Sequence, residues 1–161
     1  MRRAASTRVA AGWWAAVALA LLAAAGSPGC GRAGKPRDVC FELRASPNLS
    51  TYSGQAHVVV VDLHPLETSG GFEQLSASDL IGGAKPAGAA GAAIQLTVAP
   101  GEQREVNETF PANTKWIGVV ADYYRAPGAP EGTRKLVAPA RCGRLGSTVV
   151  VLSPNDLLLE D

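Results

Sequence analysis

The chain has 161 residues and a formal net charge of +1, from 15 Lys and Arg against 14 Asp and Glu. Three of the arginines stand among the first eight residues, so 12 basic side chains face 14 acidic ones in the rest of the chain, without a basic cluster. Nucleic-acid recognition depends on clustered Lys and Arg, so we expect no nucleic-acid partner. The length suits one domain behind an amino-terminal segment.

The first 29 residues have the composition of a signal peptide. The early arginines precede an apolar run over residues 10–25, and the small or helix-breaking residues 26–29 lead directly to Cys30. A basic start, an apolar centre and small residues at the end are typical of secretory leaders. Because bacterial lipoproteins are cleaved before a cysteine that is then acylated, we predict a signal peptide over residues 1–29 and lipidation of Cys30.

Two other interpretations of this segment stay open. Ser27 occupies the position where lipoprotein sites carry an aliphatic residue, and cleavage after Ala25 by ordinary signal peptidase would use Ala23 and Ala25 as the small pair. An uncleaved membrane anchor is the second alternative, although the apolar run is short for a span of about 20 residues. If Cys30 is lipidated, Gly31 in place of a retention aspartate predicts the periplasmic face of the outer membrane.

The cysteine count predicts a disulfide in the exported domain. If Cys30 carries lipid, Cys40 and Cys142 remain as an even pair, and an oxidising compartment permits them to join. Two separate thiols are the alternative, because a bridge needs Cα atoms within about 7 Å and the sequence does not give that distance. His57 and His64 lack the spacing of zinc sites and are expected at the surface or at strand ends. We therefore expect no metal and no cofactor.

After the lipidated cysteine and a linker over residues 30–37, residues 38–161 are predicted to form a β-sandwich domain. Apolar and polar residues alternate over 39–45, which indicates a half-buried strand. The unbroken valines Val58 to Val61 favour a strand over 57–63 that is covered on both faces. Further strands are expected at 94–98, 104–110, 116–124, 136–137 and 148–152, the last two closing the fold.

Only one stretch of this domain has a helical pattern. Apolar residues recur among polar ones over 72–81, which predicts one short helix or two single turns. The Ala/Gly tract 82–93 is expected as a loop because its glycines and proline oppose helix formation, and 126–132 is a second loop. Short strands separated by turn residues, with one small helical insertion, indicate an all-β, two-sheet β-sandwich with an aliphatic core.

A series of motifs follows the cysteine in a fixed order. The motifs are Cys30, Phe41-Glu42-Leu43-Arg44-Ala45, Asn48, Val58 to Val61, Phe72, Asp79-Leu80, Pro100-Gly101-Glu102 and Ile117-Gly118-Val119-Val120-Ala121-Asp122-Tyr123-Tyr124-Arg125. Their order and spacing resemble the TssJ family (SciN or VasD), the outer-membrane lipoproteins of bacterial type VI secretion systems. The pattern departs from the family's after Asp122, where an extra tyrosine precedes Arg125 and Thr133-Arg134-Lys135 replaces an aromatic-basic pair.

This resemblance implies a transthyretin-like two-sheet β-sandwich with a short helical insertion around residues 72–81. It also implies an anchoring role for the secretion machine's membrane complex. The implied partner is the periplasmic domain of TssM, with TssL in the same complex, while acyl chains on Cys30 hold the membrane. The implied contact is the loop 46–56, in which Asn48 matches the family's asparagine and Leu49 is an isolated apolar residue. The predicted partner-binding residues are Pro47, Asn48, Leu49, Ser50, Thr51 and Tyr52.

An enzyme is not expected from the motifs. The sequence has no G-x-S-x-G elbow, no H-E-x-x-H and no phosphate-binding Gly-rich loop. A secreted ligand- or carbohydrate-binding sandwich is the alternative function, and it would need Trp116 to line a groove with Tyr52 or Tyr124. The carboxylates that could form a catalytic pair are expected instead to be solvated charges on separate elements, namely Glu42, Asp62, Asp79 and Asp122.

Overall fold

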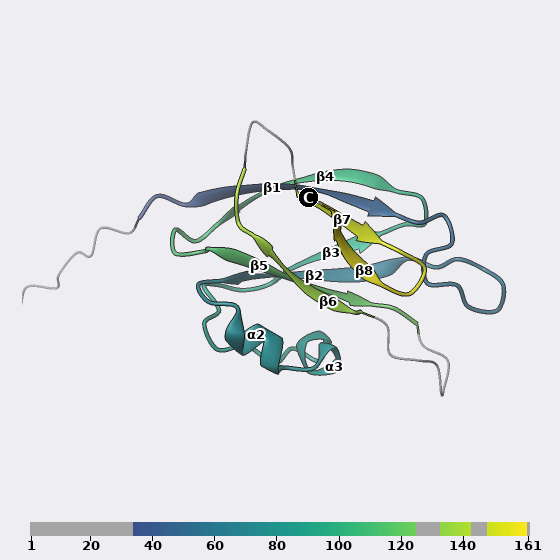
Figure 1. Ribbon diagram of the computed structural model, residues 1–161, viewed down its shortest axis with the longest axis horizontal. Helices are drawn as coiled ribbons and strands as arrows, with labels where there is room; N and C mark the ends of the chain where they lie inside the picture. Colours follow the sequence, from purple (N-terminus) through teal and green to yellow (C-terminus); the bar gives the residue numbers. More distant parts are fainter. Residues whose placement is uncertain (1–33, 125–132, 143–147, 161) are drawn as a thin grey trace, which may run out of the picture. The chain divides into compact units, whose positions relative to one another are not determined.

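The computed structural model describes residues 34–124, 133–142 and 148–160. Two four-stranded sheets have the orders β4-β1-β7-β8 and β3-β2-β5-β6 (Figure 1). The predicted all-β, two-sheet sandwich with a short helical insertion is confirmed. The elements are β1 (Arg37–Ala45), β2 (Val59–Leu66), α2 (Gly70–Gln74), α3 (Ala77–Ile81), β3 (Ile94–Val98), β4 (Gln103–Phe110), β5 (Trp116–Asp122), β6 (Lys135–Pro139), β7 (Thr148–Leu152) and β8 (Leu157–Glu160).

Strand β1 lies in the middle of the first sheet, antiparallel to β4 and parallel to β7. Its odd-numbered residues Val39, Phe41 and Leu43 are buried, while Glu42 and Arg44 stay on the outer face, as the alternation predicts. These inward side chains join those of the second sheet in one aliphatic core. Removing this apolar surface from water is the main stabilising contribution to such a sandwich.

The helical insertion covers the outer face of the second sheet (Figure 1). Leu66 and Val120 on the sheet pack with Phe72 and Leu80 from the helices in a second apolar cluster. The Phe72 ring lies so close to Gly118 that a Cβ at this glycine would come within 2.6 Å of it. A glycine is therefore needed here for close packing of the aromatic ring on the sheet.

The insertion consists of two single-turn helices, one of the two forms that the sequence predicts. Ser76 begins α3 with a capping box, in which the Ser76 side chain and Asp79 each accept the other's backbone N–H. Lys135, the first residue of β6, donates from Nζ to the carbonyl oxygens of Phe72, Glu73 and Leu75 at 3.2, 2.6 and 2.5 Å. A single lysine therefore ties the end of α2 to the edge of the second sheet.

Several strand predictions need correction at their ends. Strand β2 continues through Pro65, because β3 pairs only as far as Leu63 and a proline is tolerated where one neighbouring strand is missing. Val58 lies before the strand and is 58% exposed, so the part of the strand that is buried on both faces begins later than predicted. Strand β5 ends at Asp122, and the closing strand is β8, which follows a turn after Leu152. The signal peptide, Cys30 and the loop 126–132 lie outside the described residues.

The connections gather at two opposite ends of the sandwich (Figure 1). The β1–β2, β3–β4 and β7–β8 connections, over 46–58, 99–102 and 153–156, lie at one end. The start of β1 and the β4–β5 connection lie at the other, where Arg37 Nη1 donates to Thr114 O at 2.7 Å. The chain therefore enters the domain at the end opposite the β1–β2 connection.

Candidate functional site

The β1–β2 connection, residues 46–58, begins with a part that is fixed inside the domain. Leu49 is 0% exposed and belongs to the main core, and Ser50 is also buried. Ser50 N donates to Pro154 O at 2.9 Å, and His57 N donates to Leu49 O at 3.0 Å. Leu49 and Ser50, both predicted to contact a partner, are therefore inside the domain in this structure. The apolar Leu49 side chain gains more from the core than from the surface.

The second part of the connection is exposed from Thr51 to Val58. Tyr52 and Gln55 exchange two backbone hydrogen bonds of 2.8 and 3.0 Å across a turn. The two central residues of the turn, Ser53 and Gly54, both have positive φ, at 51° and 76°. Two consecutive positive φ values characterise the type I′ hairpin turn, which gives the tip a defined shape.

Tyr52 stacks on Tyr124, the second residue after β5. Their ring centroids are 4.0 Å apart with an interplanar angle of 44°, and the side chains are 47% and 42% exposed. The Tyr124 backbone N–H donates to Ser50 Oγ at 2.9 Å, which holds the end of β5 against the loop. The pKa of the Tyr124 hydroxyl is raised, mainly by partial desolvation and to a smaller extent by a hydrogen bond with Tyr52.

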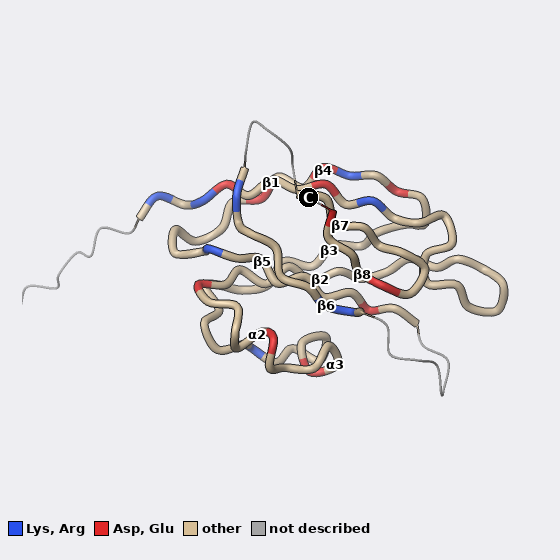
Figure 2. Tube along the Cα trace, viewed as in Figure 1, with Lys and Arg blue, Asp and Glu red and all other residues tan. Residues whose placement is uncertain are grey.

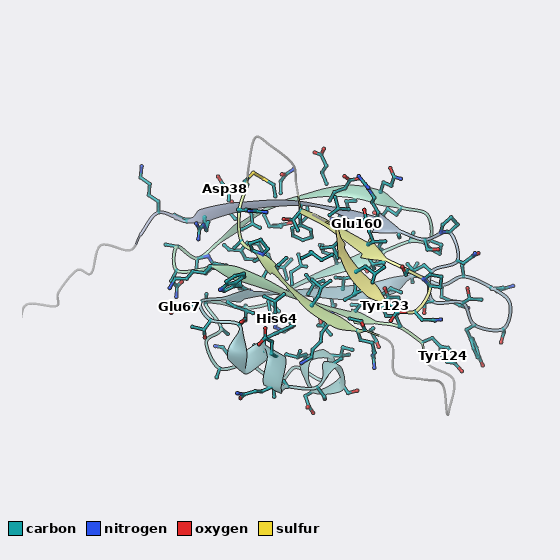
Figure 3. The ribbon with its side chains drawn as sticks, viewed as in Figure 1. Asp38, His64, Glu67, Tyr123, Tyr124 and Glu160 are labelled. Atoms are coloured by element: carbon teal, nitrogen blue, oxygen red, sulfur yellow. A yellow bond between two sulfur atoms is a disulfide. The ribbon has the colours of Figure 1, made fainter. Side chains whose placement is uncertain are left out.

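Neighbouring Tyr123 and Tyr124 point in opposite directions, as expected for adjacent residues of a strand (Figure 3). Tyr123 is buried and donates from its hydroxyl to Asp156 O at 2.9 Å, and burial raises its pKa. Tyr124 was not predicted as part of the loop site. Its signal in the sequence is the pair itself, since two adjacent residues of an extended chain point to opposite sides.

The other predicted loop residues are exposed. Pro47, Asn48 and Thr51 lie on the surface beside Tyr52. Thr51 Oγ1 donates to Asn48 O at 2.8 Å, and Asn48 N donates to Ser46 Oγ at 3.2 Å. Pro47, Asn48, Thr51 and Tyr52 are therefore available to a partner, and Tyr124 joins them from a different element.

Cys40 and Cys142 form a disulfide in the structure, with 4.6 Å between their Cα atoms and a sequence separation of 102. Cys40 lies on the outer face of β1, and its backbone N–H donates to Arg141 O at 3.2 Å. The bridge fastens the first part of β1 to the segment after β6. It therefore reinforces the strand by which the chain enters the domain.

The candidate carboxylates do not converge on a common site. Glu42 pairs with Arg44 at 2.8 Å, and the hydrogen bond from Arg44 lowers the Glu42 pKa. Asp62 accepts from Gln95 at 3.0 Å. Asp79 caps α3, and Asp122 pairs with Arg134 at 3.1 Å. Within the described ranges, no three His, Cys, Asp or Glu side chains gather closely enough to hold a metal ion.

His64 was predicted at the surface or at a strand end, and it lies buried within β2, two residues before the strand ends. It is 7% exposed and lies beside the Phe72 ring, at a centroid distance of 5.5 Å, beneath the helices (Figure 3). Desolvation lowers its pKa, against a weaker opposing effect of Asp62. The outward positions of a central strand would be exposed in a bare sandwich, and the insertion buries this one.

A groove of about 520 Å³ lies between β2, β3 and the 82–93 tract. Its lining includes Asp62, His64 and Lys85, and contains no Tyr or Trp. Trp116 pairs with Pro139 and Leu66, at the opposite end of β5 from Tyr124. The aromatic groove that a carbohydrate-binding sandwich would need, with Trp116 beside Tyr52 or Tyr124, is therefore not formed.

No helix among the described residues is long and apolar enough to cross a membrane. The fold and the site together define a β-sandwich whose distinctive surface is a loop at the end of the sheets, the usual place for recognition in such folds. Residues 37–151 match the family described as type VI secretion lipoprotein, VasD, EvfM and TssJ (T6SS-SciN). The chain belongs to this type VI secretion lipoprotein family.

Solved structures share the fold. Lipoprotein TssJ1 from Pseudomonas aeruginosa is 23% identical with a TM-score of 0.66, covering 78% of this chain and 96% of its own. Serratia marcescens Lip, a membrane-bound component of the type VI secretion system, is 14% identical with a TM-score of 0.65, covering 77% and 97%. A chain in a structure described as the TssM C-terminal domain from EAEC is 20% identical with a TM-score of 0.64, covering 78% and 98%. No curated protein sequence matches significantly.

Proposed function

We propose that this protein is an outer-membrane lipoprotein that anchors the membrane complex of a type VI secretion system by binding the periplasmic part of TssM, in a complex that also contains TssL. The exposed part of the β1–β2 connection, with Tyr52 stacked on Tyr124, is the observation that carries the proposal. Membership of the lipoprotein family supports it, as does a similar structure whose description names the TssM C-terminal domain.

The position of the chain entry supports this role. The sandwich begins at Arg37, seven residues after Cys30, and a fully extended segment of that length spans at most about 25 Å. The β1–β2 connection lies at the opposite end of the domain, one strand further along the chain. A lipid on Cys30 would thus hold one end near the membrane and leave the other end directed toward a periplasmic partner.

The partner assignment is tested by binding of the TssM periplasmic region to the purified domain. We expect Asn48→Ala/Tyr52→Ala to lose at least about tenfold in affinity, because exposed aromatic residues concentrate binding energy. The matched control is Glu105→Ala/Asn107→Ala, two exposed positions on β4, which should bind like the wild type. Unchanged binding by the loop variant, with an unchanged melting temperature, would contradict the assignment.

Lipidation of Cys30, with residues 1–29 as the signal peptide and 30–37 as the linker, is tested by labelling cells with radioactive palmitate. Label should enter the wild type and be absent from Cys30→Ser. The wild type should fractionate with the outer membrane, since two or more acyl chains anchor a protein firmly whereas one does not. Equal labelling of both proteins, or a soluble wild type that begins after Ala25, would overturn this part of the proposal.

We further propose that Cys40 and Cys142 are joined in the exported protein. Mass spectrometry of the periplasmic form without reductant should show one peptide pair linked through these residues. Denaturation with and without reductant should differ by about 2–5 kcal/mol, as for other native disulfides. Two alkylated thiols in the non-reduced protein would refute the pairing.

A further inference from the structure

We propose that the docking surface is an uncharged aromatic face that receives a large apolar side chain from an uncharged segment of the partner protein. The face consists of Tyr52, Val58 and Tyr124, and we call it the tyrosine face. The inference rests on the proposed function, because it takes the β1–β2 connection as the binding site. It adds the chemistry of recognition and two residues outside the predicted loop.

One observed contact and one extrapolation of the strand register bring the three side chains together. Tyr52 stacks on Tyr124 at 4.0 Å between ring centroids. Strand β2 pairs with β5 so that Val60 faces Asp122, and continuing this antiparallel register by two residues places Val58 opposite Tyr124. The strand period of two also puts Val58 and Tyr124 on the same side of the sheet. The tyrosine face is therefore continuous across two elements that are distant in the sequence.

These side chains are exposed although they are large and apolar. Their exposed fractions are 42% to 58%, whereas apolar side chains of the same strands are buried in the core. Isolated exposed hydrophobic residues are common, but three adjacent ones at a loop end are typical of an interaction site. Tyrosine is also enriched among the residues that dominate binding energy at protein interfaces.

The described loop that carries Tyr52 and Val58 has no charged side chain. The connection 46–58 contains no Lys, Arg, Asp or Glu, and its trace carries neither of the charge colours (Figure 2). Charged groups at the same end have internal partners. Glu102 Oε2 accepts from Ala99 N at 2.7 Å, and Asp156 Oδ1 accepts from Thr133 N at 2.6 Å. Asp122 pairs with Arg134. Among the described residues, the loop 46–58 therefore offers a charged partner segment no counter-ion, so apolar complementarity is favoured.

The tyrosine face is also held in shape before any partner binds. Buried Leu49 fixes the start of the loop, Ser50 Oγ holds the Tyr124 backbone, and the turn after Tyr52 has its own pair of hydrogen bonds. A surface that needs little ordering loses less entropy on association. The rings are therefore presented in a fixed arrangement.

The test measures affinity of the wild-type domain and of Val58→Ser, Tyr124→Ser and Tyr124→Glu for the TssM periplasmic region. We expect each serine variant to lose at least about tenfold and Tyr124→Glu more, while Tyr124→Phe binds within about threefold of the wild type. Affinity of the wild type should change less than about threefold between 50 and 500 mM NaCl, because no ion pair is screened.

The outcomes separate this inference from the proposed function. If Asn48→Ala/Tyr52→Ala loses binding but Val58→Ser and Tyr124→Ser, folded by their melts, bind normally, the loop assignment stands and the tyrosine face is wrong. A fall in affinity of more than about tenfold over the salt range would also overturn it, since that requires charged contacts. Failure of the wild type to bind the TssM region would overturn the proposed function itself and the tyrosine face with it.

Discussion

Two long connections of this domain differ in how they pack against the sandwich. The β1–β2 connection, 46–58, turns one apolar side chain inward, Leu49, and is exposed from Thr51 to Val58 at the end of the sandwich. The β2–β3 connection, 67–93, turns Phe72 and Leu80 inward and folds over the outer face of the second sheet. Surplus length alone therefore does not mark a recognition loop. The number and position of the inward anchors decide whether a connection covers the core or remains a surface.

Their charges differ in the same way. The covering connection contains Glu67, Glu73, Asp79 and Lys85, and its end is fastened by Lys135 from β6. The exposed connection contains no formal charge. Charged groups keep the outer surface of a covering segment solvated. The exposed loop lacks such charged groups, which agrees with the apolar recognition proposed for the tyrosine face.

The largest expected effect is on the covering connection. Phe72→Ala should lower the free energy of unfolding by about 3–5 kcal/mol, because it removes the ring that packs on Gly118 and leaves a cavity. Urea denaturation measures the change. Gln74→Ala, at an exposed position of the same helix, should stay within about 0.5 kcal/mol of the wild type. A loss of less than about 1 kcal/mol for Phe72→Ala would show that the insertion contributes little to stability.

Leu49→Ala tests whether the exposed connection has a structural anchor. We expect a loss of about 2–5 kcal/mol in unfolding free energy, as for other fully buried leucines. Tyr52→Ala, three residues on, should cost no more than about 1.5 kcal/mol, since its ring is half exposed and loses mainly the stacking contact. Equal stability losses for the two variants would remove the distinction between anchor and surface.

Lys135→Met tests how the covering connection is fastened. The methionine keeps the apolar stem but removes the three charge-assisted hydrogen bonds to the carbonyl groups at the end of α2, which should cost about 1–3 kcal/mol. Hydrogen exchange should accelerate in residues 70–75 before the rest of the domain. Lys85→Met, an exposed lysine of the same connection, is the matched control. Unchanged exchange in Lys135→Met would assign the fastening to the apolar contacts alone.

The smallest effect concerns pH. Burial lowers the pKa of His64, so the unfolded chain binds a proton at this residue more readily than the folded domain does. The corresponding stability is complete above the unfolded pKa of about 6.5 and is lost as pH falls through it toward the folded pKa. His64→Phe should therefore show a flatter stability curve between pH 8 and pH 5. Identical slopes for the two proteins would show that the covering connection does not keep this imidazole neutral.

Local patterns in the sequence predicted seven of the eight strands. Alternation placed β1 correctly and gave the bounds of β3, because the period of two follows directly from the geometry of a strand with one buried face. The run of β-branched residues over 148–152 predicted β7 with its observed bounds. The polar and apolar pattern over 72–81 indicated helical structure, as one short helix or two single turns, because a helix repeats about every 3.6 residues. The short strand β8 was missed because three adjacent leucines show no alternation, although the turn residues 153–156 before them were a usable signal.

The tertiary structure decided which of these residues form the site. Leu49 and Tyr52 stand in the same polar stretch, and only the adjacent core shows that one is an anchor and the other a surface. Tyr124 reaches Tyr52 through strand pairing across more than 70 residues, and His64 is buried by helices that follow it in the chain. Local composition determines the alternation, the turns and the absence of charge. Burial and proximity depend on which elements pack together, and that depends on contacts between distant parts of the chain.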